Sequence, residues 1–153
     1  MRRVNRSRDD LEMMKRYATC FTSSQLTVGK VDEGYFMSMT KEVVRDTMKD
    51  QNLVVLNVLP AKEYLKLHIK GSQSLPLGPD EDDFIREAEK RYGKDRFLIT
   101  YCADRTCHAG PNAATILLRN GFRANDYPGG MKEWADAGYP VEGTEVAEEQ
   151  ASK

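Results

Sequence analysis

The sequence is short of several features that would point to a common class of function. Its formal net charge is −1 across 153 residues, so it lacks the overall field that attracts nucleic acid or anionic lipid, and we expect neither as a partner. It has three cysteines, an odd number that cannot all pair in disulfide bonds. This composition favours chemistry on a small molecule or on another protein.

A long apolar run is also missing. The first 21 residues, MRRVNRSRDDLEMMKRYATCF, contain arginines with no apolar stretch behind them, which predicts neither a signal peptide nor a membrane span. We therefore expect a cytoplasmic protein. In that reducing compartment the cysteines should be free thiols unless they take part in redox or sulfur chemistry.

What is present is a regular alternation of strand and helix patterns. Strands are predicted at 35–39, 53–58, 73–76, 97–101 and 123–127. Helices are predicted after the cap Thr40, in PAKEYLK, in DEDDFIREAEKRY up to Gly93, from Pro111 to Gly121, and in MKEWADAG. The alternation predicts an α/β fold, an open and mostly parallel sheet with helices on both faces.

The chain divides into three parts. The compact domain is predicted at 35–143, with an extension at 1–34 that holds a short helix over 8–20 and a polar connector. The apolar face of that helix must be covered, either by the same domain or by a second copy in a homodimer. Residues 144–153 lack apolar periodicity and are expected to be disordered.

Two of the three cysteines lie in one turn between a strand and a helix, in the stretch YCADRTCHAGP. Active sites of parallel sheets gather beyond the carboxyl ends of the strands, where Cys102 follows a buried strand. A loop that enters a helix at Pro111 is expected to curl its amides around that sulfur and to lower the pKa of the Cys102 thiol. We therefore predict that Cys102 is a nucleophile.

The rest of the turn offers candidates for binding a substrate. Cys107 has three interpretations: a resolving or second sulfur-carrying thiol, a neutral loop residue, or a metal ligand with Cys102 and His108. Because a closed zinc site needs four ligands and this set has three, we predict no metal. No cofactor is predicted either. The candidate substrate-binding residues are Ala103, Asp104, Arg105, Thr106 and His108. Arg105 is a candidate for the positive charge, and His108 for stabilising a thiolate or accepting a proton, unless both are simply exposed.

Three residues outside this turn have simpler interpretations. His68 is predicted to hydrogen-bond to the backbone of its turn, LHIKGS. Trp134 is predicted to anchor the last helix in the core, and Cys20 to be unreactive.

Several stretches resemble landmarks of rhodanese-like domains, in the same order and at similar spacing over roughly residues 36–143. They are LVVLNVLPAKEYLKLHIKGSQSLPL, FLITYC, AATILLRNGF and YPGGMKEWADAGYPVEG. The resemblance implies a five-stranded, mostly parallel sheet and an active cysteine after its fourth strand, which is Cys102 here. It also implies a sulfurtransferase or sulfur carrier, in which this cysteine takes sulfane sulfur from a small donor such as thiosulfate, holds it as a persulfide, and passes it to a thiol acceptor, which can be a protein.

The resemblance has departures that leave other functions open. Where the family has an aspartate and an arginine at one strand end, this chain has Asn57 and Leu59, and Cys107 and His108 occupy the back of the loop. A catalytically silent protein-interaction module is one alternative. A phosphatase or arsenate reductase is another, although His108 stands where such an enzyme has an arginine.

Overall fold

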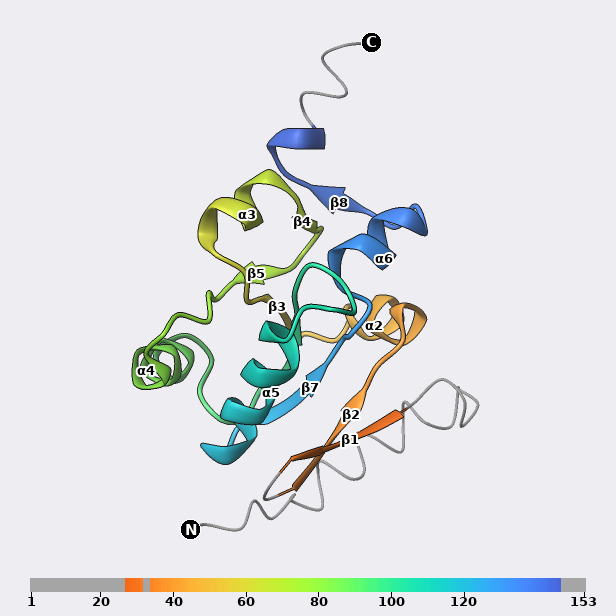
Figure 1. The fold of residues 1–153 in the computed structure, drawn as a ribbon. Helices are drawn as coiled ribbons and strands as arrows, with labels where there is room; N and C mark the ends of the chain where they lie inside the picture. The colour runs from red at the N-terminus through yellow and green to blue at the C-terminus, as the bar shows by residue number, and fades with distance from the viewer. Residues whose placement is uncertain (1–26, 32–33, 147–153) are drawn as a thin grey trace.

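The computed structural model describes residues 27–31 and 34–146. Its main sheet has six strands in the order β1-β2-β7-β6-β3-β5 (Figure 1). These are β1 (Thr27–Val31), β2 (Gly34–Ser38), β7 (Arg123–Asp126), β6 (Phe97–Tyr101), β3 (Leu53–Asn57) and β5 (Gln73–Ser74). All neighbours pair in parallel except β1, which runs antiparallel to β2 at the edge. The predicted mostly parallel sheet is therefore confirmed.

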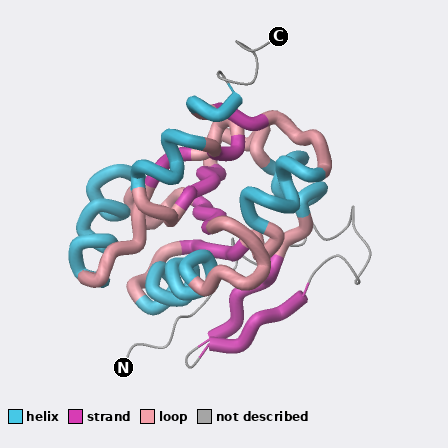
Figure 2. The backbone as a smooth tube through the Cα atoms, turned by 45° about the horizontal axis from the view of Figure 1, so that its top comes forward, coloured by secondary structure: helices cyan, strands magenta, loops and turns pink. Residues whose placement is uncertain are grey.

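Helices cover both faces of this sheet, as Figure 2 shows. One face packs against α4 (Glu81–Tyr92) and α5 (Ala109–Arg119), and the other against α2 (Lys41–Thr47) and α6 (Gly130–Asp136). Side chains alternate along each strand: Leu98 enters the α4/α5 side, while Phe97 and Ile99 enter the other side. Every residue of β3 and of β6 is buried, which is why both read as continuous apolar runs.

The helix ends follow the signals in the sequence. Thr40 accepts a hydrogen bond from the Val43 amide at 3.3 Å and so caps α2, and Asp80 caps α4 through the amides of Asp82 and Asp83. Gly93 ends α4 with φ of 64°. The helix α5 starts two residues earlier than predicted, with His108 as its N-cap, because Pro111 is tolerated anywhere in the first turn, where amides have no partner in the helix.

A second, two-stranded sheet was not predicted from the sequence. The strand β4 (His68–Ile69), after the short helix α3 (Ala61–Lys66), pairs antiparallel with β8 (Val141–Glu142). Trp134 is buried beside it and donates a hydrogen bond to the Pro140 carbonyl, so its predicted role as an anchor of the last helix is confirmed. His68 does bond to the backbone, but to the Tyr64 carbonyl of α3, at 2.8 Å.

The ends of the domain differ from the prediction. Residues 27–31, interpreted as part of a polar connector, form the edge strand β1, because each of them pairs with a residue of β2. Residues 144–146 form a helical turn instead of a disordered segment. The predicted helix over 8–20 and residues 147–153 lie outside the described residues. Within the described ranges, no helix has the length and apolar character that crossing a bilayer needs.

Candidate active site

The cysteine loop, residues 102–108, connects β6 to α5 at the carboxyl edge of the sheet (Figure 1). Its first residues are held by the start of α6: the amide of Met131 donates to the Cys102 carbonyl, and the amide of Lys132 to the Ala103 carbonyl, both at 2.9 Å. A β-carbon on Gly130 would lie 2.6 Å from the Cys102 carbonyl oxygen. The absence of a side chain at Gly130 therefore permits this close backbone contact.

The middle of the loop is shaped by Asp104. Its carboxylate accepts hydrogen bonds from the amide of Thr106 at 2.9 Å and from the Thr106 hydroxyl at 2.6 Å, and these bonds lower the pKa of Asp104. The Asp104 carbonyl accepts from the amide of Cys107 at 3.2 Å. The chain is thus bent back on itself between the two cysteines.

This bend brings the two cysteines together, and both are free thiols. The Cys102 sulfur lies 3.5 Å from the Cys107 carbonyl oxygen, to which its thiol donates, and the same thiol interacts with the Cys107 sulfur. Cys102 is 3% exposed and packs in the α4/α5 core, whereas Cys107 is half-buried at the edge of that core. The fold of the loop therefore places Cys107 next to Cys102.

The pKa of the Cys102 thiol is shifted in the direction opposite to the prediction. Burial raises the pKa of Cys102 to about 12, even though the amide of Gly110 favours its thiolate. Burial also acts to raise the pKa of Cys107, but the Cys102 thiol and the amides of Ala103 and Ala109 outweigh it and lower that pKa. The expectation of a lowered pKa at Cys102 was wrong because the thiol is buried, and because the amides of Ala103 and Ala109 favour the thiolate of Cys107 instead.

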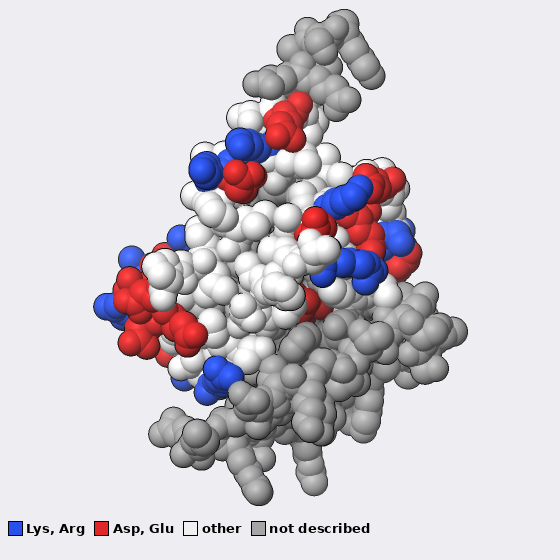
Figure 3. All heavy atoms as spheres, in the orientation of Figure 1, with Lys and Arg blue, Asp and Glu red and all other residues white. Residues whose placement is uncertain are grey.

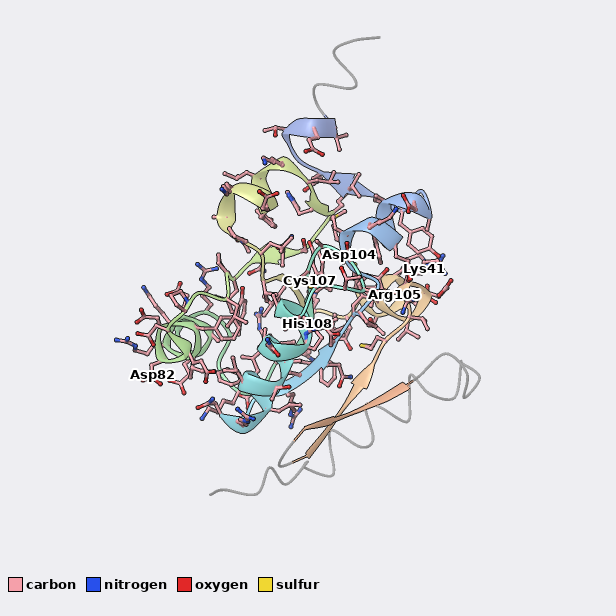
Figure 4. The ribbon with its side chains drawn as sticks, in the orientation of Figure 1. Lys41, Asp82, Asp104, Arg105, Cys107 and His108 are labelled. Atoms are coloured by element: carbon pink, nitrogen blue, oxygen red, sulfur yellow. The ribbon has the colours of Figure 1, made fainter. Side chains whose placement is uncertain are left out.

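Most of the remaining loop residues are exposed. The Arg105 guanidinium bonds to Glu133 Oε2 at 2.6 Å and lies on the same side of the loop as Lys41 (Figure 4). His108 is exposed at the start of α5, and its side chain makes no capping hydrogen bond. Ala103 and Thr106 are exposed too. Within residues 27–31 and 34–146, no three His, Cys, Asp or Glu side chains converge as metal ligands do, so Cys102, Cys107 and His108 form no such cluster.

An open pocket of about 600 Å³ lies beside the loop. Its walls come from the loop, from α2 and from α6, and they include Asp104, Arg105, Thr106, Lys41, Lys132 and Glu133. Neither cysteine lines it. In Figure 3 charged side chains of both signs gather over α2 and α6, while the adjoining face is mostly uncharged. The pocket is therefore a polar region next to the thiols and not the space around them.

Comparison with known proteins places this arrangement in a family. A rhodanese-like domain model matches residues 40–137, which is more than half of the chain. The chain belongs to the rhodanese-like domain family. Among the relatives of this rhodanese-like chain is the HTH-type transcriptional regulator Rv0324 of Mycobacterium tuberculosis, which is 32% identical over 90 residues. The match covers 59% of this chain but only 38% of the regulator.

Solved structures show the same fold. The BH2092 protein from Bacillus halodurans superposes with a TM-score of 0.64 at 23% identity, covering 88% of this chain and 87% of that one. The rhodanese-like domain of the Alr3790 protein from Anabaena has a TM-score of 0.61 at 22% identity, covering 71% of this chain and 80% of that one.

Two residues near the thiols were missed from the sequence. Asp126 was interpreted as an ordinary part of the last strand, and Gly110 as part of a turn. The available signal was the charge of Asp126 within a predicted strand, because a carboxyl group is seldom buried in a purely structural position.

Proposed function

We propose that this rhodanese-like chain is a sulfurtransferase or sulfur carrier that forms a persulfide on Cys102, with Cys107 as the resolving thiol. The observation that carries the proposal is that the free thiol of Cys102 donates to the Cys107 carbonyl and interacts with the free thiol of Cys107, at the carboxyl edge of the sheet in a domain of this family. The donor is a small sulfane-sulfur compound such as thiosulfate, and the acceptor is a thiol. Because the reaction needs both cysteines as thiols, we place it in the cytoplasm.

In the folded protein the pKa of Cys107 is lowered and that of Cys102 is raised, so Cys107 ionises more readily and Cys102 keeps its proton near neutral pH. Cys102 must therefore lose that proton before it attacks the sulfane sulfur. A thiolate of high pKa is also the stronger nucleophile once it is formed. After loading, the Cys107 thiolate can attack the inner sulfur of the Cys102 persulfide, which releases hydrosulfide and leaves a disulfide that an external thiol reduces.

The surroundings of the loop weigh against phosphatase or arsenate-reductase chemistry. Such a site needs a guanidinium wrapped around an oxyanion at the nucleophilic cysteine. Here the guanidinium of Arg105 is paired with Glu133, and an exposed imidazole, that of His108, occupies the sixth position after Cys102.

A second candidate is a recognition module without sulfur transfer. It is favoured by one observation, the similarity to a protein named as an HTH-type transcriptional regulator, in which the matched part is 38% of the length. As a module, the domain would bind its partner whether or not Cys102 is present.

Intact-mass measurement tests the proposal. The protein is incubated separately with thiosulfate, 3-mercaptopyruvate and a polysulfide, and its mass is recorded before and after reductant. We expect the gain of one sulfur atom, removed by reductant, and we expect Cys102→Ser to abolish it. Cys107→Ser should load as the parent does and keep its persulfide longer, while Cys20→Ser serves as the matched control. Absence of loading with all three donors would favour the recognition module, and loading that survives in Cys102→Ser would assign the persulfide to another cysteine.

A further inference from the structure

The carboxyl group of Asp126 is the least satisfied polar group near the two thiols. Asp126 is the last residue of β7 and is 1% exposed. Its Oδ1 is 3.3 Å from the Thr100 hydroxyl, which also bonds to the Gly110 carbonyl at 2.8 Å, and its Oδ2 has no hydrogen-bond partner. A buried carboxyl oxygen without a partner costs free energy, so a structural role alone does not account for it.

This carboxyl shares one small space with Cys102. The position where a β-carbon of Gly110 would stand is 2.6 Å from Asp126 Oδ1 and 3.5 Å from the Cys102 sulfur. Because residue 110 is glycine, it places no side chain between the carboxyl and the thiol, which lie on the buried α4/α5 side of the molecule. The negative charge of Asp126 also interacts with the Cys102 thiol, since it contributes to the raised pKa of Cys102.

The groups near the carboxyl are Thr100 from β6, Cys102 at the end of β6, and Gly110 from α5. On the other side of β7, β2 meets the backbone of Asp126 through Ser38 and Met39. None of these residues is a cation. Burial consequently raises the pKa of Asp126 to about 7, with only the Thr100 hydroxyl opposing it. A carboxyl with this pKa exchanges its proton near neutral pH, which is the range in which a general base works best.

We propose that Asp126 is the proton acceptor for Cys102 in the loading step, an inference that rests on the proposed function. As Cys102 attacks the outer sulfur of a donor such as thiosulfate, the thiol proton passes to the Asp126 carboxylate. A bond forms between the Cys102 sulfur and the sulfane sulfur, the S–S bond of the donor breaks, and sulfite leaves with its electron pair. When an acceptor thiolate later removes the outer sulfur as its own persulfide, Asp126 returns the proton to Cys102.

Asp126→Asn tests the proposal because it keeps the size of the side chain and removes the base. The loading rate of the parent should rise with pH through the ionisation of Asp126 and then level off. In Asp126→Asn we expect loading on the order of 100-fold slower near neutral pH, with that inflection lost. The matched control is Asp95→Asn, an exposed carboxylate in the turn before β6, which should load as the parent does. An unchanged rate and pH profile in Asp126→Asn would overturn the inference.

A second measurement separates this inference from the proposed function. In a Cys107→Ser background, the rate at which iodoacetamide alkylates Cys102 is followed against pH, with and without Asp126→Asn. Because the Asp126 charge raises the pKa of Cys102, its removal should shift the alkylation profile to lower pH. If no donor loads the parent, the proposed function fails, while such a shift still supports the pairing of Asp126 with Cys102. Superimposable alkylation profiles would overturn that pairing.

Discussion

Tyr101 and Cys102 are neighbours in the chain, but their side chains enter opposite faces of the sheet and meet different polar surroundings. On the α2/α6 face the buried Tyr101 hydroxyl accepts hydrogen bonds from the Asn57 amide group and from the Ile69 amide, both at 3.1 Å. It lies 2.8 Å from the Ser72 hydroxyl, which bonds to the Ile69 carbonyl at 2.6 Å. On the other face, Asp126 Oδ2 beside Cys102 has no partner.

The difference separates a buried polar group that holds the fold from one that we assign to chemistry. The Tyr101 hydroxyl has all its hydrogen-bonding positions filled, and it ties β6 to β3 and to the segment around β4. Asn57 stands where the resemblance led us to expect an aspartate. A side-chain amide fits this place because its nitrogen donates to the Tyr101 hydroxyl oxygen, while its oxygen accepts from the backbone amide of Leu59.

The largest expected effect is the pH dependence that Asp126 imposes on stability. Its pKa is raised to about 7 in the folded state, against about 4 in the unfolded chain, so the folded state binds the proton more tightly. The free energy of unfolding should therefore fall as pH rises from about 4 to about 7, by as much as about 4 kcal/mol. Urea unfolding at several pH values measures this, and Asp126→Asn should lack that part of the fall. Equal pH dependence in the two proteins would contradict the assignment.

Tyr101→Phe removes the hydroxyl at the centre of the hydrogen-bond network on the α2/α6 face. Removing the hydroxyl leaves buried donors on Asn57 and Ile69 without their acceptor, and we expect a loss of about 3 kcal/mol in the free energy of unfolding. The matched control is Tyr64→Phe, which removes one half-buried bond to the Ser72 carbonyl and should cost about 1 kcal/mol. Similar losses in both variants would show that the hydrogen bonds of Tyr101 stabilise the fold no more than the single bond of Tyr64 does.

Gly110→Ala fills the space that Cys102 and Asp126 share. The new β-carbon would meet Asp126 Oδ1 at 2.6 Å, so we expect a loss of about 2 kcal/mol despite the better helix propensity of alanine. Combining it with Asp126→Ala should recover most of that loss, because the contact is then absent. Gly78→Ala, with no neighbour within 4 Å of the new carbon, is the control. Additive losses in the double variant would place the strain elsewhere.

The smallest effect concerns the resting state of the two thiols. A short pulse of iodoacetamide at neutral pH should label Cys107 roughly tenfold faster than Cys102, because Cys107 is more exposed and has the lowered pKa. Peptide mapping measures the ratio, and unfolding in urea should bring it close to one. Faster labelling of Cys102 would instead support the ionisation that the sequence alone predicted.

The sequence determined the central strands, the helices that cover them and the place of the candidate site, because these depend on local signals. Continuous apolar runs marked β3 and β6, the caps Thr40 and Gly93 marked helix ends, and parallel strands meet their loops at one edge, which placed Cys102 there. The short strands β1, β4 and β8 were missed because their pairing depends on partners and not on a pattern of their own.

Only the tertiary structure decided which of the two thiols ionises more readily, and that the carboxyl of Asp126 lies beside Cys102. The pKa of a thiol depends on burial and on the direction of nearby amides, and the fold of residues 102–110 directs the amides of Ala103 and Ala109 at Cys107. Asp126 lies 24 residues after Cys102, and its contact with the site exists only because β7 pairs with β6 and Gly110 leaves room. Local sequence carries no information on such distances, since they arise when separate strands and helices pack together.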